Sequence, residues 1–234
     1  MRVLKPGLLV VFAAACGGGG SFSPGVGDDP GSGTSTLFVD ADVDARPIVP
    51  NARESTDFTT EFHVRLEKAG VAVTTGTVTI TSGAGEVPLV YRTDSNRWHG
   101  VQVGYFEVYE LSAVSGSDDV TGVRVDGPAL HTITAPALGA TVDSTMPLTV
   151  TWDRDEEADQ ASIETEEIDA LAIADTGSHV LPPGSLKDNQ DQTEQERIRI
   201  DRSQRVTPAG AVAGSAMRVE IRNEVEILVQ PTGP

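Results

Sequence analysis

The chain has a single cysteine in 234 residues, Cys16, so no disulfide can form within it and its domains must be held together by core packing. Basic residues are also few, because 17 Lys and Arg stand against 35 Asp and Glu, and the formal net charge is −18. A field this negative repels nucleic acid backbones and anionic lipid headgroups. We therefore expect no nucleic acid partner.

Signals of catalysis and of metal binding are missing as well. There is no Gly-x-Ser-x-Gly elbow, Ser-x-x-Lys pair, phosphate-binding glycine loop or His-Glu-x-x-His motif. The four histidines lie far apart in the sequence without ligand spacing: His63, His99, His131 and His179. We expect a protein that is not an enzyme and carries no cofactor or zinc ion.

The N-terminus has the pattern of an export signal. Arg2 and Lys5 precede an apolar stretch, Leu8 to Ala15, whose eight residues are far fewer than the ~20 that span a bilayer as a helix. Small residues then lead to the cysteine, in the order Ala13-Ala14-Ala15-Cys16, and glycines follow. The alternative interpretation is an ordinary secretory signal that is cleaved after an Ala-x-Ala pattern.

This segment resembles the lipobox of bacterial lipoproteins that signal peptidase II processes. The resemblance implies that residues 1–15 are a signal peptide and that Cys16 becomes the first residue of the mature chain, with a diacylglycerol thioether and an acylated amino group. Two such modifications suffice for stable anchoring. The membrane is then a partner through the lipid on Cys16. Gly17, where an Asp would signal retention at the inner membrane, resembles sorting to the outer membrane.

Composition and two-residue alternation predict an all-β fold. Residues 16–35 are rich in Gly, Ser and Pro and are expected to form a flexible tether after the lipidated cysteine. Residues 36–134 are expected to form a first β-sandwich module, because apolar side chains alternate along runs separated by turn signals. The clearest run places four side chains on one face: Phe58, Phe62, Val64 and Leu66.

Residues 135–231 are expected to form a second sandwich. Its opening, Pro147-Leu148-Thr149-Val150-Thr151-Trp152, resembles the start of bacterial Ig-like and fibronectin type III-like modules, in which a strand ends in a buried Trp. The resemblance implies two tandem Ig-like antiparallel sandwiches and transfers no functional residue. Asp155 to Ala174 could be helical by propensity, but we predict strand and loop there because β elements flank it.

Asp40, Asp42 and Asp44 form an Asp-x-Asp-x-Asp run that is a weak candidate for calcium binding. An EF-hand loop needs Gly at its sixth position and Glu at its twelfth, where this chain has Ala45 and Asn51. Alternation instead predicts a solvated strand face. Calcium between loops of the two modules is the alternative, with Asp118 and Asp119 as further ligands.

A second acidic run between Asp153 and Asp175 allows a docking patch for a cationic partner or cross-strand pairing with arginines. We favour pairing, with partners among the later arginines: Arg197, Arg199, Arg218 and Arg222. Glu164 and Glu166 are the acidic residues whose neutralisation tests it.

The function predicted from these features is that of a lipid-anchored cell-envelope protein at the outer membrane, with a structural or protein-interaction role. The alternative is a carbohydrate-binding or adhesive surface module. It would need exposed aromatic side chains, and the candidates are Trp98, Tyr105 and Tyr109, for which we expect core positions. The sequence names no ligand-binding residue.

Overall fold

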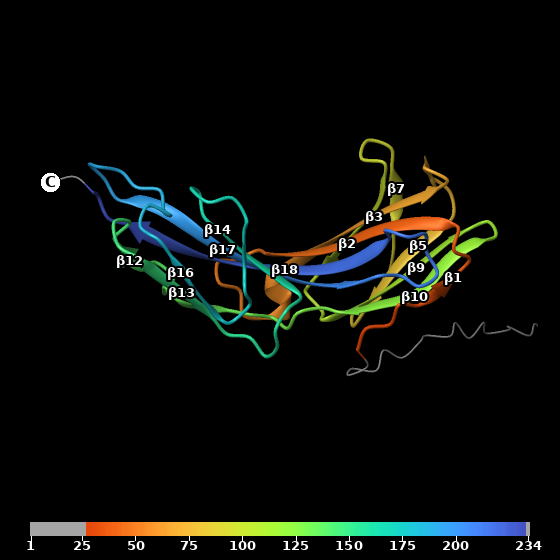
Figure 1. The fold of residues 1–234 in the computed structure, drawn as a ribbon, viewed down its shortest axis with the longest axis horizontal. Coiled ribbons are helices and arrows are strands. Elements are labelled where there is room, and N and C mark those ends of the chain that lie inside the picture. The colour runs from red at the N-terminus through yellow and green to blue at the C-terminus, as the bar shows by residue number, and fades with distance from the viewer. Residues whose placement is uncertain (1–26, 233–234) are drawn as a thin grey trace, which may run out of the picture.

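The computed structural model describes residues 27–232, and these residues form β-strands with a single 3-10 turn, η1 (Ser55–Asp57). The prediction of an all-β fold is confirmed. The molecule is elongated, with two lobes that share the long strands running between them (Figure 1). The predicted signal peptide and Cys16 lie outside the described residues.

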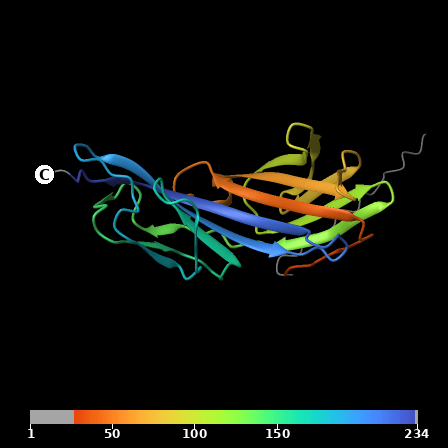
Figure 2. The ribbon, with the colours of Figure 1, turned by 45° about the horizontal axis from the view of Figure 1, so that its top comes forward.

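The largest sheet runs the length of the molecule, and a turned view shows its long strands crossing from one lobe to the other (Figure 2). Its order is β15 (Leu171–Ile173), β14 (Gln160–Glu164), β17 (Glu194–Val206), β18 (Ala216–Val229), β2 (Leu37–Pro47), β3 (Phe58–Lys68), β8 (Arg97–Val103) and β7 (Val90–Arg92), with β12 (Thr141–Val142) beside β18 and β4 (Val71–Ala72) beside β3. Its pairs are antiparallel, except that β18 runs parallel to β2 and to β12.

Two smaller sheets complete the two sandwiches. The first has the order β1 (Ser32–Gly33), β10 (Asp118–Asp126), β9 (Val108–Ser115), β5 (Thr77–Ser82) and β6 (Gly85–Pro88). The second has the order β11 (Ile133–Ala135), β13 (Leu148–Trp152) and β16 (Ser178–Leu181). Each sheet encloses its own hydrophobic cluster against the large sheet.

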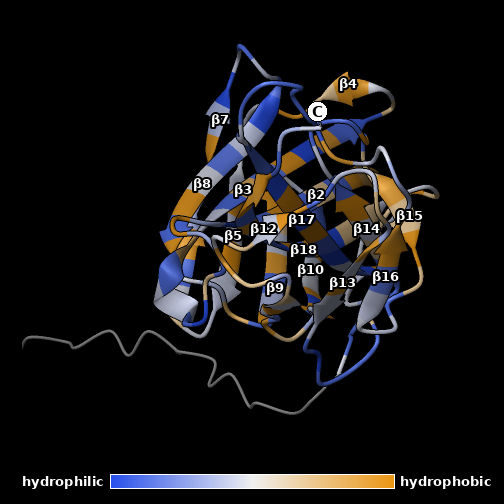
Figure 3. Ribbon diagram, turned by 90° about the vertical axis from the view of Figure 1, so that its left-hand side faces the viewer, coloured by the Kyte–Doolittle hydropathy of each residue, from blue (hydrophilic) through white to orange (hydrophobic). Residues whose placement is uncertain are grey.

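Alternation along the strands explains which side chains are buried. Phe58, Phe62, Val64 and Leu66 of β3 all lie in the first core, as predicted. Thr60 is buried as well, and the other residues between them are half-buried or exposed. In β13, Val150 and Trp152 are buried and Leu148 packs against the same core. Figure 3 shows hydrophilic and hydrophobic segments that succeed each other along the strands. β8 departs from the rule at its end, where Val101 and Val103 are exposed and Gln102 between them is buried.

The C-terminal hairpin belongs to both sandwiches. β17 and β18 pair without a break from Glu194 opposite Val229 to Val206 opposite Met217. One end of this hairpin contributes Val206, Met217, Val219 and Ile221 to the first core, and the other end contributes Ile198, Ile200, Val225, Ile227 and Val229 to the second. The expected division into modules 36–134 and 135–231 therefore needs a correction, because the second segment also completes the first sandwich.

The described part of the expected tether needs a correction too. Ser32 and Gly33 pair with Thr121 and Val120 of β10, and Asp29 forms an isolated bridge with Arg124. Backbone hydrogen bonds to a free sheet edge fix this segment without any large side chain to bury. Between Asp155 and Ala174, the structure shows strands β14 and β15 with loops, which confirms the prediction of strand and loop over helix.

A buried polar cluster marks the boundary between the two cores. Arg202 is fully buried on β17, where it donates to Asp175 Oδ2 at 2.9 Å and to the carbonyl oxygen of Ala129 at 2.9 Å. Asn223, also fully buried, donates from Nδ2 to the carbonyl oxygens of Ala52 and His131 at 2.8 and 2.7 Å. Buried backbone carbonyls of the segment that crosses between the two smaller sheets, and of the connection between β2 and β3, thus find partners, as buried backbone groups require.

Asp175 is held in its charged form inside this cluster. Burial opposes its ionisation, but donors from Ala158 N, Trp152 Nε1 and Arg202 outweigh that effect and keep the pKa of Asp175 below its usual range. The ion pair between Arg202 and Asp175 is inaccessible to solvent at both ends. Such a pair leaves a costly unpaired charge when one partner is removed.

His131 lies in the same region with no solvent exposure, and Nε2 is 3.3 Å from the carbonyl oxygen of Ile200. Burial, with the charge of Arg202 acting in the same direction, lowers the pKa of His131 to about 4. The folded protein therefore holds this imidazole neutral.

We predict that Arg202→Met destabilises the protein by about 3–5 kcal/mol, because it leaves the Asp175 carboxylate buried without its cation. Urea unfolding at neutral pH measures the loss. Arg205→Met is the matched control, since Arg205 is exposed on the same strand and its replacement should stay within about 0.5 kcal/mol of the original. Equal effects of the two substitutions would contradict the role of the buried pair.

We predict that the buried imidazole also makes stability fall with acidity. The unfolded chain protonates His131 below its ordinary pKa of 6.5, whereas the folded chain resists protonation until about 4. Its contribution is complete above pH 6.5 and declines as the pH falls, by about 2 kcal/mol at pH 5. Unfolding of the original protein and of His131→Gln at pH 7 and pH 5 checks this, and parallel losses in the two would refute it.

Candidate functional site

The outer face of the large sheet is the most distinctive surface of the molecule. Both smaller sheets pack on the opposite face, so the outward positions of β2, β3, β8, β17 and β18 remain in contact with solvent. We call this surface the charged face. Its carboxylates are Asp40, Asp42, Asp44, Glu61, Glu67, Glu164, Asp201, Glu220, Glu224 and Glu226, and its guanidinium groups are Arg65, Arg97, Arg197, Arg199, Arg218 and Arg222.

The predicted calcium candidates belong to this face. Asp40, Asp42 and Asp44 alternate with buried residues of β2, as a solvated strand face requires. Arginines from both neighbouring directions pair with them: Arg97 approaches Asp42 Oδ2 to 3.2 Å, and Arg218 approaches Asp42 Oδ1 to 3.2 Å. Cations already neutralise the carboxylates that a calcium ion would need.

Asp118 and Asp119, the further residues considered as calcium ligands, have other contacts in the structure. Asp118 Oδ2 accepts from Lys68 Nζ at 2.5 Å, and its Oδ1 accepts from Thr36. Asp119 pairs with Val114 in the five-stranded sheet. In the part of the chain from 27 to 232, no group of three or more His, Cys, Asp or Glu side chains is arranged to hold a metal ion.

Like charges also meet across the strands of the charged face. Glu220 of β18 lies opposite Asp44 of β2, and Asp44 lies opposite Glu61 of β3. Burial raises the pKa of Asp44, with Asp42 adding to the effect and Arg218 opposing it. Burial likewise raises the pKa of Glu220, against the opposing charge of Arg218. The middle of the face is therefore a row of carboxylates bordered by arginines.

The acidic run between Asp153 and Asp175 is partly paired, in the way the cross-strand prediction describes. Glu164 forms ion pairs with Arg199 and Arg222, which lie on the two strands next in order. Glu166 is paired instead with Lys187, at an exposed position. The other two predicted arginines have different partners, since Arg218 binds β2 and β18 carboxylates and Arg197 binds Glu224 and Glu226.

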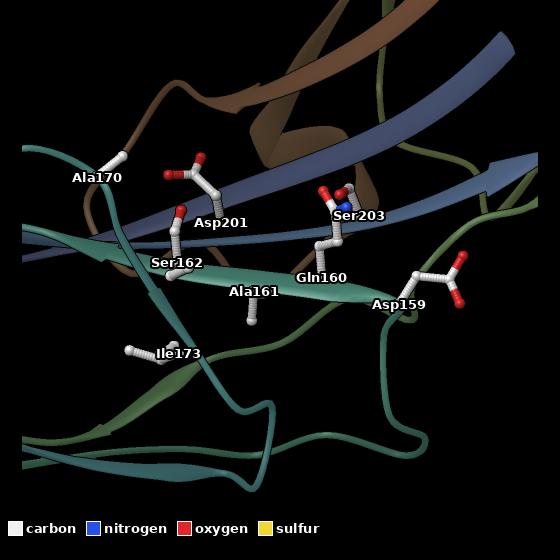
Figure 4. Close-up of a pocket in the computed structure, with 9 residues that line it drawn as sticks. Asp159, Gln160, Ala161, Ser162, Ala170, Ile173, Asp201 and Ser203 are labelled. Atoms are coloured by element: carbon white, nitrogen blue, oxygen red, sulfur yellow. The ribbon is translucent and has the colours of Figure 1, made fainter. Parts of the chain in front are cut away.

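A cavity of about 430 Å³ lies near the end of the charged face, over β14, β17 and β15. Ser162, Asp201, Gln160 and Ser203 point to the same side of these strands, whereas Ala161 and Ile173 point to the other side (Figure 4). Asp201 accepts two hydrogen bonds from Arg222 there. The cavity offers hydroxyl, amide and carboxylate groups beside small apolar ones.

The aromatic residues considered for sugar stacking are in the first core. Trp98, Tyr105 and Tyr109 are at most 5% exposed, which confirms the expectation of core positions. Trp98 Nε1 donates to the carbonyl oxygen of Val73, and Tyr105 Oη donates to that of Pro128. These three rings therefore form no exposed platform.

The structure brings together two histidines that the sequence separates. His63 of β3 and His99 of β8 are directly opposite each other, with ring centroids 4.6 Å apart. Burial, followed by the neighbouring His63, lowers the pKa of His99. Sequence spacing does not reveal this contact between His63 and His99, because strand register brings the two rings together. His131 and His179 lie elsewhere, in the interior and on β16.

Comparison with known proteins gives little further guidance. No protein-family model matches the chain, and no curated protein sequence matches it. A solved structure of the Bacteroides ovatus mixed-linkage glucan utilization locus protein SGBP-B, in complex with a mixed-linkage heptasaccharide, is similar at 11% sequence identity with a TM-score of 0.17. The match covers 84% of this chain and 60% of that one, so the chain spans less than two thirds of its length. This TM-score is too low to support an argument about fold or ligand.

Among residues 27–232, no helix is long and apolar enough to cross a membrane.

Proposed function

We propose that this chain is a non-catalytic protein of the cell envelope, anchored at the outer membrane by a lipid on Cys16, which binds another envelope protein through its charged face. The observation that carries the proposal is the continuity of this face, which extends over both sandwiches on one sheet. Both signs of charge are interspersed on it, and such patterns give orientation and selectivity to protein contacts.

An apolar margin on the same face also supports a protein partner. Val90, Val101 and Val103 are 68%, 59% and 72% exposed on β7 and β8. Val101 lies opposite Glu61 and Val90 lies opposite His99, so these side chains share the outward direction of the charged face. Protein interfaces combine a small apolar centre with a polar surround.

The first described residues and the charged face are on different layers of the first sandwich. The first described residues run along β10, at the edge of the five-stranded sheet, whereas the charged face belongs to the other layer of the sandwich. A lipid on Cys16 would therefore tether the protein through the five-stranded sheet and leave the charged face available.

A carbohydrate ligand is the alternative, and the polar cavity is the feature that favours it. Gln160, Ser162, Ser203 and Asp201 supply the donors and acceptors that sugar hydroxyls need, and Ala170 and Ala172 supply an apolar wall. The cavity lacks an aromatic lining residue.

The anchor is tested with Cys16→Ser. We expect the original protein to fractionate with membranes and the variant to appear in the soluble fraction, because the lipid is lost with the thiol. Mass spectrometry of the N-terminal peptide provides the second measurement. A variant that stays with membranes after mild salt washing, or an unacylated thiol in the original, would contradict lipid anchoring.

The partner is tested by proximity labelling in the native cell envelope. We expect a reproducible protein partner whose labelling is lost in the double variant Val101→Glu/Val103→Glu, because buried carboxylates would prevent docking. Val114→Glu is the matched control, since Val114 is also an exposed strand valine but lies on β9 of the five-stranded sheet. Labelling that survives the double variant would place the contact elsewhere. Glycan-array binding that is lost in Gln160→Ala would favour the carbohydrate alternative.

A further inference from the structure

The C-terminal half of β8 forms a sheet edge that no other strand covers. β7 pairs with β8 only at Arg97, Trp98 and His99. β3 pairs with the opposite side of β8 as far as Val103. Among residues 27–232, no strand pairs with positions 100–103 of β8 on the side away from β3.

Leu89 and Gly100 explain why the chain leaves this edge open. Leu89, the residue before β7, is buried, and its N–H donates to the carbonyl oxygen of Val78 in the five-stranded sheet at 2.8 Å. A Cβ atom on Gly100 would overlap Leu89 Cδ2, so the missing side chain of Gly100 makes room for Leu89. The chain therefore crosses to the other sheet at this point and does not continue along β8.

The register shows which backbone groups reach the open edge. Gly104 N donates to the carbonyl oxygen of Phe58 at 2.8 Å, directly after the last pair between β3 and β8. Hydrogen-bonded and non-hydrogen-bonded pairs alternate along an antiparallel ladder. The even-numbered residues of β8 therefore bond to β3, whereas Val101 and Val103 direct their N–H and C=O groups away from it. Neither valine forms another backbone hydrogen bond within the described part of the chain.

Val101 and Val103 also present their side chains to solvent, since they are 59% and 72% exposed. Soluble proteins commonly protect free strand edges with charged residues or proline. β16 illustrates such protection, because Pro182 follows it and the carbonyl oxygen of Ser178 accepts from Thr176 Oγ1 at 3.0 Å. The open positions of β8, Gly-Val-Gln-Val, contain no charge and no proline. This edge can therefore accept an additional strand.

Carboxylates border the open edge on both sides. Glu61 of β3 lies opposite Val101 and faces outward with it. Glu86 of β6 is exposed, and its neighbour Val87 lies close to Gly100. Neither carboxylate forms an ion pair with Lys or Arg among residues 27–232. Together with the net charge of −18, these carboxylates favour a basic occupant.

We propose that an extended basic segment of the protein partner adds to the open edge of β8 as a further strand. Its backbone pairs with the N–H and C=O groups of Val101 and Val103, and its apolar side chains at alternate positions cover the two valines. A second copy of this chain would bring the same negative charge, so a basic segment fits better. The inference rests on the proposed protein partner and specifies how that partner binds.

A seven-residue peptide of alternating lysine and valine with blocked ends is the probe. We expect the amide hydrogens of Val101 and Val103 to exchange rapidly with solvent in the full chain in detergent, and that of Gln102 to exchange slowly. The peptide should protect both valine amides, as NMR-detected hydrogen exchange measures. The same peptide with N-methylated valines should not protect them, because it lacks the N–H groups that pair with β8. A peptide of aspartate and valine should bind more weakly.

Val101→Pro removes the outward N–H and leaves the hydrogen bonds to β3 intact, as edge strands tolerate. The affinity for the lysine–valine peptide should fall about tenfold in an NMR titration. Val180→Pro is the matched control, since Val180 is also an exposed edge valine. Trp152 N bonds to the carbonyl oxygen of Gly177, so by alternation the backbone groups of Val180 likewise face away from the neighbouring strand. This variant should bind the peptide as the original does.

Thermal unfolding should give similar midpoints for both variants, and the N-methylated peptide tests the proposal without any variant. No protection at millimolar peptide, equal protection by the N-methylated peptide, or an equal loss of affinity in Val180→Pro would overturn the proposal. Partner labelling that is lost in Val101→Glu/Val103→Glu but kept in folded Val101→Pro would reject strand addition and retain the protein partner. The expected peptide response without any labelled partner would reject the proposed function and retain the strand-binding edge.

Discussion

One constraint organises this fold. A single sheet covers two separate cores, and the buried backbone polar groups of the segment that crosses between these cores need hydrogen-bond partners. Arg202 and Asn223 meet this need from neighbouring strands, because their side chains bind the carbonyl oxygens of Ala129 and His131 on the crossing segment. Asn223 also binds the carbonyl oxygen of Ala52 in the connection between β2 and β3. Apolar side chains at these two positions would leave backbone oxygens buried without donors, at a cost of a few kcal/mol. The hairpin β17–β18 can pass from one core to the other because of this polar boundary.

The strands β17 and β18 pass from the first core to the second only with their inward side chains. Their outward face is therefore continuous across both sandwiches. Outward positions of β17 and β18 keep the same alternation on both sides of the boundary, so charged residues of the two sandwiches align on one surface. A true tandem pair of modules would be joined by a linker and would interrupt such a surface. Sharing a sheet also fixes the relative orientation of the two sandwiches, which suits a rigid docking face.

Much of the strand content could be predicted from sequence, whereas the assembly of strands could not. Alternation identifies the inward side chains of β3 and β13, but it does not say which strands are neighbours, so the role of β18 in the first sandwich was missed. A signal for the boundary was present, since Arg202 and Asn223 interrupt apolar series at inward positions. Nothing in the sequence places His63 opposite His99, because strand register determines that contact. The pairing of Ser32 and Gly33 with β10 could not be predicted, because it uses backbone atoms and amino-acid composition gives no information about it.

The register between β2 and β18, which come from opposite ends of the chain, shows which interactions specify the fold. A slip by one residue would turn every apolar side chain outward and is excluded by alternation. A slip by two residues keeps alternation and would place Arg222 opposite Asp44, so the charges on the outer face do not exclude it. Asn223 excludes the two-residue slip, because its side chain binds both the N–H and the carbonyl of Ala52 and also the carbonyl of His131. Exposed ion pairs contribute little individually, and here a buried amide decides which residues of β2 and β18 face each other.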